Sequence, residues 1–213
     1  MKILIACEFS GIVREAFRKR GHDAWSCDLL PSDDNSPFHI QGDVLEILDH
    51  GWDMMIAHPP CTYLTCSAEW AYKDVQTKNI KPGTLIGHAR RLARDQATDF
   101  FMRLANANVD RICLENPVGV MSTRWCKPDQ YIQPNQFGDD ASKNTGLWLK
   151  NLTRLVVDPA QRIQGRIVDG KERWANQTDS GQNRLGPSAN RWQLRSATYP
   201  GIAKAMAKQW GTK

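Results

Sequence analysis

Cys61 has the setting in this sequence that points most clearly to chemistry, because two prolines fix the backbone directly before it. Proline has no N–H group for a sheet ladder and restricts φ, so Pro59 and Pro60 end the apolar run 54–57 abruptly. A thiol at the end of a buried strand lies where open α/β sheets bind their ligands. We interpret Cys61 as a nucleophile activated by nearby positive charge or helix dipoles. The alternative is a small buried hydrophobic residue, which most free cysteines are.

A carboxyl group, that of Glu115, has a similar setting further along the chain. It follows the apolar residues 112–114 and precedes Asn116 and Pro117. A carboxyl group at the end of a buried strand can hold a proton and donate it, which would make Glu115 a partner for the thiol. The alternative is a structural carboxylate that caps the following turn.

His58, Cys61 and Cys66 are close enough in sequence to raise the question of a metal site. Their spacing is not C-x-x-C, and the two prolines make chelation by His58 and Cys61 awkward. We therefore expect no metal.

The turn at Phe9, Ser10 and Gly11 and the acid Asp28 form a further candidate binding site. The turn lacks both the G-x-G-x-x-G pattern of dinucleotide sites and the lysine of a phosphate loop. An acid at the end of the second strand suits vicinal ribose hydroxyls. The pattern therefore predicts an adenosyl ligand without a pyrophosphate; the alternative is a turn glycine and a strand-end cap.

Alternating strands and helices must position these groups. The apolar run that begins the chain is continuous, which is typical of a parallel strand buried on both faces. The predicted strands are 2–7, 24–27, 39–40, 54–57, 111–114, 131–133 and 146–149, and the predicted helices are 12–20, 44–48, 89–105 and 201–210. This alternation predicts an α/β fold with a mostly parallel sheet. Residues 62–87 are interpreted as a long functional loop or lid, and 160–196 have no clear assignment.

Composition limits the class of protein. The 213 residues suffice for one domain with a sizeable core, and a net charge of +5 suits a phosphate-bearing partner only weakly. No apolar run approaches the roughly 20 residues that cross a bilayer, and the first residues do not resemble a signal peptide. The six cysteines are scattered, as in reduced proteins, so we expect a cytoplasmic location.

The ordered set of candidate residues resembles the cytosine-C5 DNA methyltransferases. The residues that carry the resemblance are Phe9-Ser10-Gly11, Asp28, Gly42-Asp43, Pro60-Cys61 and Glu115-Asn116. The resemblance implies a Rossmann-like S-adenosylmethionine-dependent methyltransferase fold with helices on both faces of the sheet. It also implies that Phe9, Ser10, Gly11, Asp28, Asp43 and Pro60 bind S-adenosylmethionine, that Cys61 is the nucleophile and that Glu115 and Asn116 bind the cytosine.

A looser match follows in the second half of the chain. Phe137-Gly138, Lys143 and Thr145 fall where the family has a substrate-side strand, with Lys143 in place of an arginine. The resemblance implies a catalytic role for Lys143, substrate contacts by Pro59 and Thr145, and a last helix, at 201–210, that closes over the cofactor. The second and third glycines of the first turn are missing, and Pro117 replaces the usual valine.

The family's DNA-reading lobe has no room in this chain, and 150–196 is interpreted as a reduced or variable substrate-side segment. The chain therefore resembles small phage-encoded members of the family, which would act in the host cytoplasm. The expected activity is methylation of cytosine at C5 through a covalent Cys61 adduct, on DNA or on a free cytosine nucleotide. An expected DNA-binding surface contains Arg162, Arg166, Lys171, Arg173, Arg184, Arg191 and Arg195 with Trp174 and Trp192 between them. The alternative is a solvated segment whose tryptophans pack on the core.

Two other functions stay open. His58-Pro59-Pro60 has a partial likeness to the (Asn/Asp)-Pro-Pro-(Tyr/Phe) motif of amino (N4 or N6) DNA methyltransferases. The first and last residues of the motif, which hold the amino group, are His58 and Cys61 here. The second alternative is a catalytically inactive module that binds nucleic acid or S-adenosylmethionine. The intact pair of Cys61 and Glu115 argues against it.

Overall fold

A seven-stranded sheet organises the computed structural model, which describes residues 1–74, 80–188 and 191–212, without the side chain of Trp192. Its strands are β1 (Lys2–Ala6), β2 (Asp23–Asp28), β3 (His39–Gln41), β4 (Met54–Ala57), β5 (Arg111–Pro117), β6 (Gln130–Ile132) and β7 (Thr145–Lys150). Their order is β3-β2-β1-β4-β5-β7-β6. The first five are parallel, whereas β7 runs antiparallel to both β5 and β6. The predicted α/β class with a mostly parallel, Rossmann-like sheet is confirmed.

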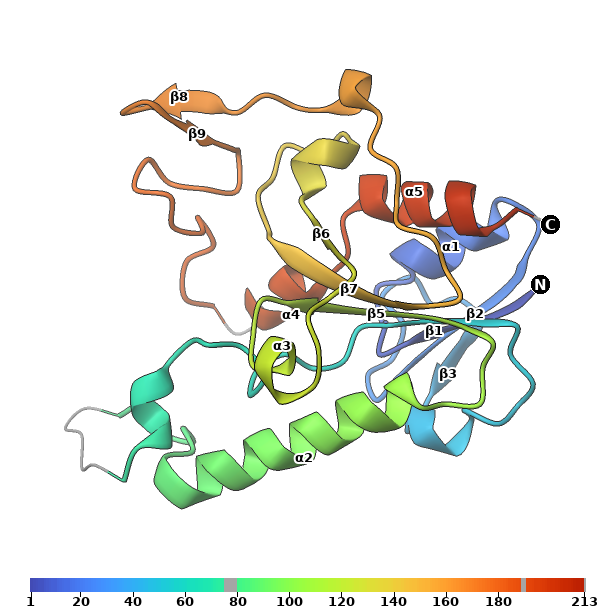
Figure 1. The fold of residues 1–213 in the computed structure, drawn as a ribbon, viewed down its shortest axis with the longest axis horizontal. Helices are drawn as coiled ribbons and strands as arrows, with labels where there is room; N and C mark the ends of the chain where they lie inside the picture. The colour runs from blue at the N-terminus through green and yellow to red at the C-terminus, as the bar shows by residue number, and fades with distance from the viewer. Residues whose placement is uncertain (75–79, 189–190, 213) are drawn as a thin grey trace.

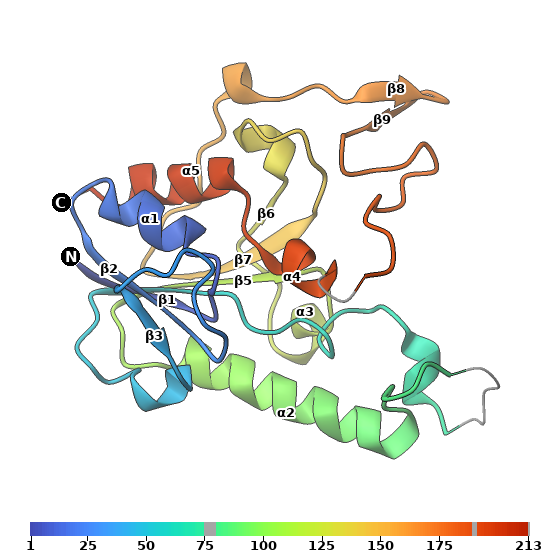
Figure 2. The same cartoon turned by 180° about the vertical axis from the view of Figure 1, so that it is seen from behind.

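Helices cover both faces of this sheet, as Figures 1 and 2 show: α1 and α5 lie on one face and α2 lies on the other. The α-helices are α1 (Ile12–Arg18), α2 (Gly87–Ala105), α3 (Met121–Arg124), α4 (Arg191–Ser196) and α5 (Pro200–Trp210). Short 3-10 helices are η1 (Val44–Glu46), η2 (Glu69–Tyr72), η3 (Pro134–Phe137) and η4 (Pro159–Gln161). No helix among the described residues has the length and apolar character needed to cross a membrane.

The central strand β1 explains why the core has two halves. Ile3 and Ile5 belong to the cluster that includes residues of α1 and α5, whereas Leu4 and Ala6 belong to the cluster beneath α2. All four side chains are fully buried. A continuous apolar strand is therefore needed, because each face of the strand meets a helical layer.

Three segments extend beyond the sheet on the side to which β5 leads (Figures 1 and 2). They are the connection from β4 to α2, the helix α4, and a small lobe built on the hairpin of β8 (Arg166–Val168) and β9 (Lys171–Arg173). The expected loop at 62–87 contains η2, and its residues 75–79 lie outside the described part of the chain. Any functional groups at the carboxyl ends of β4 and β5 therefore face this cluster of loops.

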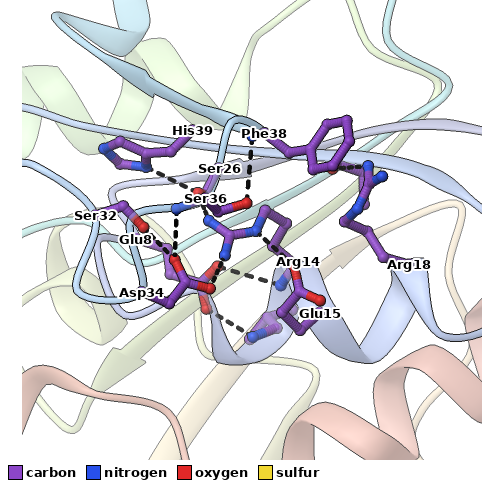
Figure 3. A network of polar contacts seen from close by, with 12 residues as sticks. Glu8, Arg14, Glu15, Arg18, Ser26, Ser32, Asp34, Ser36, Phe38 and His39 are labelled. Atoms are coloured by element: carbon purple, nitrogen blue, oxygen red, sulfur yellow. Dashed lines mark hydrogen bonds and ion pairs between the residues drawn. The ribbon is translucent and has the colours of Figure 1, made fainter.

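The turn after β1 is held by Arg14, whose fully buried guanidinium hydrogen-bonds to Ser26, 2.8 Å away, and pairs with Asp34 (Figure 3). Asp34 lies in the loop after β2, so the pair joins that loop to α1. Gly11 has a φ of 70°, and a Cβ atom there would collide with the Arg14 guanidinium. The turn therefore needs glycine both for its backbone conformation and for the space that Arg14 occupies.

Replacing Arg14 by methionine is expected to lower the free energy of unfolding by about 2 kcal/mol, because the change leaves Ser26 and Asp34 without their buried partner. The half-exposed position of Asp34 limits the cost. Urea denaturation measures the difference, and Arg20→Met, at an exposed position just after the end of α1, serves as the control. Equal stability of the two variants would contradict this account of the network.

Candidate active site

Cys61 begins a tight turn four residues after the end of β4, the strand that pairs with β1 on one side and with β5 on the other. Its carbonyl oxygen accepts hydrogen bonds from the backbone N–H groups of Leu64 and Thr65, each 3.0 Å away. Leu64 is buried, which anchors the turn to the core beneath α2. The half-buried cysteine is therefore fixed on both sides, by Pro59 and Pro60 before it and by this turn after it.

The end of β5 holds the same turn from the side. The Asn116 side-chain amide donates a 2.7 Å hydrogen bond to the carbonyl oxygen of Pro59, and both residues are buried. Further along the chain, the backbone N–H of Val120 donates a 2.8 Å hydrogen bond to the carbonyl oxygen of Leu64. Asn116 thus positions the loop that carries Cys61.

Glu115 lies beside the cysteine loop in the interior of the protein. Its Oε2 atom is 2.8 Å from Nδ1 of His58, and each side chain is 9% exposed. Burial alone would raise the pKa of Glu115, but the positive charge of Lys143 and hydrogen bonds from His58 and Thr145 lower this pKa to about 2. The direction of this pKa favours an ionised Glu115, whereas the sequence analysis expected the carboxyl group to hold a proton.

The thiol of Cys61 is close enough to Glu115, Lys143 and Arg195 to respond to their charges. Burial raises its pKa above the ordinary value, and the negative charge of Glu115 adds to this rise; Lys143 and Arg195 act in the opposite direction. The expected positive charges are thus present, but they do not outweigh burial. At rest Cys61 is a thiol, and Lys143 is the largest influence that favours the thiolate.

Replacing Lys143 by methionine is expected to raise the pKa of Cys61 further and to slow its alkylation about three- to tenfold at pH 8, because less thiolate is present at a given pH. Iodoacetamide labelling followed by peptide mass spectrometry reports Cys61 separately from the other five cysteines. Lys208→Met, on the exposed side of α5, should leave the rate unchanged. An unchanged rate in the Lys143 variant would show that this charge does not act on the thiol.

A cavity of about 260 Å³ opens beside the cysteine loop, at the ends of β1 and β2. Its lining residues are Cys7, Cys27, Asp28, Leu29, Gly42, Asp43, Val44, Leu45, Pro60 and Phe100. Three of the predicted cofactor residues, Asp28, Asp43 and Pro60, thus share one cavity. Two carboxylates in a partly apolar hollow suit a ligand with hydroxyl donors and a positive charge. The volume of about 260 Å³ is slightly below the roughly 300 Å³ at which small-molecule sites begin.

The remaining predicted cofactor residues lie elsewhere. Ser10 and Gly11 line a second cavity of about 290 Å³, together with Pro200 and Lys204 of α5. Phe9 is buried and borders neither cavity. The structure therefore divides the predicted cofactor set, because the turn after β1 carries Ser10 and Gly11 towards α5 and away from Asp28.

The N-terminus of α1 is already occupied by a carboxylate of the protein. Glu8 is buried and accepts hydrogen bonds from the backbone N–H groups of Val13, at 2.7 Å, and Arg14, at 3.2 Å. In phosphate-binding loops such N–H groups bind the ligand. Their use by Glu8 agrees with the predicted lack of a pyrophosphate site.

The predicted basic surface is largely engaged within its own lobe. Arg162 pairs with Glu172, and Arg166 pairs with Asp179 and donates to two backbone carbonyls. Arg173 likewise donates to carbonyl oxygens of the lobe. These arginines stabilise the β8–β9 lobe itself, which favours the structural interpretation for this part of the set.

The other members of the set differ in position. Trp174 donates to the carbonyl of Ile163 and is half-buried, whereas the side chain of Trp192 lies outside the described residues. Lys171, Arg184 and Arg195 are exposed. Arg195 is near enough to Cys61 to influence the pKa of the thiol. The described residues include no group of three histidine, cysteine or acidic side chains that could hold a metal ion.

His58 is the site residue that sequence analysis did not recognise. The sequence indicates His58 only as a possible metal ligand and as a residue that departs from the amino-methyltransferase motif. A usable signal existed: His58 and Glu115 are the first polar residues after the apolar runs of neighbouring parallel strands. Because β4 and β5 pair Ala57 with Leu114, the next step of the register places His58 beside Glu115.

Comparisons with known proteins give a likeness of fold. No protein-family model and no curated protein matches the chain. Among solved structures, an E. coli prophage protein assigned as a DNA modification methyltransferase is 13% identical, with a TM-score of 0.43, over 69% of this chain and 45% of that one. A DNMT2 variant from Spodoptera frugiperda is 17% identical, with a TM-score of 0.37, over 71% of this chain and 50% of that one. The chain thus matches about half the length of either structure, and neither likeness assigns a role to a residue.

Proposed function

We propose that this protein is an S-adenosylmethionine-dependent methyltransferase that methylates cytosine at C5. The observation that carries the proposal is the joining of Cys61 and Glu115 across two neighbouring strand ends. Asn116 links the two strand ends through Pro59, at 2.7 Å, and Lys143 exerts its charge on both groups. Attack on a pyrimidine ring requires a nucleophile, and it requires a group such as a carboxylate that holds the base by hydrogen bonds.

Cys61 forms a bond to C6 of the cytosine, which makes C5 electron-rich. Glu115 accepts hydrogen bonds from the polar edge of the base and so fixes the ring over the thiol. Lys143 favours the thiolate and balances the charge of Glu115. After C5 gains the methyl group and releases its proton to water, the bond between sulfur and C6 breaks. The released thiolate then takes up a proton, which restores the Cys61 thiol.

S-Adenosylmethionine, when bound, supplies an electrophilic methyl group. Asp28 and Asp43 would hold its polar and cationic parts in the 260 Å³ cavity, whose wall includes Pro60, the residue before the nucleophile. Ser10 and Gly11 belong to the proposed cofactor site only if the ligand extends towards α5, where the terminal helix would close over it. The chain is proposed to act as one domain, with 150–196 on the substrate side.

Methyl transfer to cytosine is tested with labelled S-adenosylmethionine and three acceptors: duplex DNA, single-stranded DNA and deoxycytidine monophosphate. The expected product is 5-methylcytosine in at least one arm, identified by nucleoside analysis. Activity on the mononucleotide alone would fit the engagement of Arg162, Arg166 and Arg173 within their own lobe, because a free base needs no flipping. The proposal would be overturned if N4-methylcytosine formed in place of 5-methylcytosine, or if none of the three acceptors gave a methylated product.

A further inference from the structure

His58 has contacts that an ordinary structural histidine would not need. Its Nδ1 atom is 2.8 Å from Glu115, and the only other side-chain hydrogen-bond contact of His58 in the described part of the chain joins Nδ1 to the hydroxyl of Thr198, at 3.5 Å. Its Nε2 atom is buried and has no partner among the described residues. An unpaired buried nitrogen costs about 1–3 kcal/mol, which an apolar side chain at this position would avoid.

The charges that surround His58 come from several elements. Glu115 of β5 lies in contact, and Glu8, in the turn after β1, is close enough for His58 to lower its pKa, although burial keeps that pKa raised. Lys143, before β7, acts on the same Glu115 carboxylate. His58 is therefore the hydrogen-bond donor in a buried group that contains two carboxylates and one lysine.

His58 is also joined by the backbone to the nucleophile. It precedes Pro59, Pro60 and Cys61 in one rigid segment, and the side chain of Asn116 fixes that segment to β5. A hydrogen bond from His58 to Glu115 therefore holds the carboxylate at a fixed position relative to the thiol. The same bond favours the ionised form of Glu115.

We propose that His58 is a positioning residue that keeps Glu115 ionised, so that the cytosine is bound with the proton on its own N3 atom. This inference rests on the proposed function. A carboxylate has room for donors besides Nδ1, and a cytosine protonated at N3 offers two parallel donors, N3–H and the amino group. The proton is taken from solvent when the base binds. The Cys61 thiol releases its proton to solvent, and attack of the resulting thiolate on C6 neutralises the positively charged ring. The N3 proton returns to solvent after elimination.

The ionisation of Glu115 can be measured without any substrate. Glutamate labelled with ¹³C at the side-chain carboxyl, with Glu115→Gln to assign the resonance, reports the carboxyl group by NMR. Between pH 4 and 7 the Glu115 signal of the unaltered protein should not titrate, because its pKa is lowered to about 2. His58→Asn, which keeps an N–H donor near the position of Nδ1, should behave alike. His58→Phe should bring the titration into this window, and a Glu115 signal that titrates there in the unaltered protein would overturn the inference.

Proton uptake tests the second half of the inference. A single-stranded oligonucleotide with one cytosine is bound in the presence of S-adenosylhomocysteine and measured by calorimetry in buffers of different ionisation enthalpy. About one proton should be taken up per base by the unaltered protein and by His58→Asn, and markedly less by His58→Phe. Absence of uptake in the unaltered protein would overturn the inference even if 5-methylcytosine forms. Absence of base binding with an unchanged NMR result would instead count against the proposed function.

Discussion

Replacing Cys61 by alanine is expected to reduce methyl transfer by about 10⁴-fold or more, because the alanine side chain cannot form the bond to C6. Lys143 and Arg195 act on this thiol, and the turn closed by Leu64 holds it in place. The loss should appear in kcat, since alanine removes no group from the cavity lined by Asp28 and Asp43. Equilibrium binding of S-adenosylhomocysteine should accordingly stay near the level of the unaltered protein.

The chain offers a matched control for this experiment five residues away. Cys66 is exposed and lies outside the turn, so Cys66→Ala should retain full activity. A trapped adduct on a 5-fluorocytosine substrate, found by mass spectrometry on the peptide that contains Cys61, would show the covalent bond directly. Full activity of Cys61→Ala would remove the covalent mechanism.

Replacing Glu115 by glutamine is expected to lower kcat about 10²- to 10³-fold, the size of effect that follows removal of one group aimed at developing charge. Glutamine keeps the shape of the side chain but cannot accept two donors from the base or balance Lys143. The same loss of negative charge should lower the pKa of Cys61, because Glu115 is one of the influences that raise it. Cys61 should therefore be alkylated faster in a variant that catalyses more slowly.

These opposite changes distinguish a local electrostatic role from general misfolding, which would expose all the cysteines together. Glu46→Gln, at an exposed position in η1, is the control and should change neither rate. Slower alkylation of Cys61 together with slower catalysis would contradict the assigned geometry.

The frame of the fold was predictable because its elements follow short-range rules. The predicted strand 54–57 matches β4, and the predicted helix 89–105 lies within α2. The ends of β4 and β5 carry Cys61 and Glu115, so their proximity followed from the parallel order of strands. What decided these predictions was the continuous apolar character of the strands.

The remainder depended on contacts that sequence spacing does not encode. The β8–β9 hairpin has strands of three residues with little apolar content, and ion pairs such as Arg162 with Glu172 hold the lobe together. The separation of Gly11 from Asp28 depends on the direction of one turn, which the buried Arg14 sets. The pKa of Glu115 depends on three partners from two separate segments: His58 after β4, and Lys143 and Thr145 just before and at the start of β7.

The raised pKa of the resting Cys61 also bears on how the protein withstands peroxide. Oxidation to sulfenic acid proceeds through the thiolate, so a half-buried thiol with little thiolate at neutral pH is a poor target. Cys66 is exposed and would meet an oxidant first. The reactive sulfur of Cys61 would thus be kept reduced between turnovers by its own surroundings, while the surface thiol of Cys66 is oxidised.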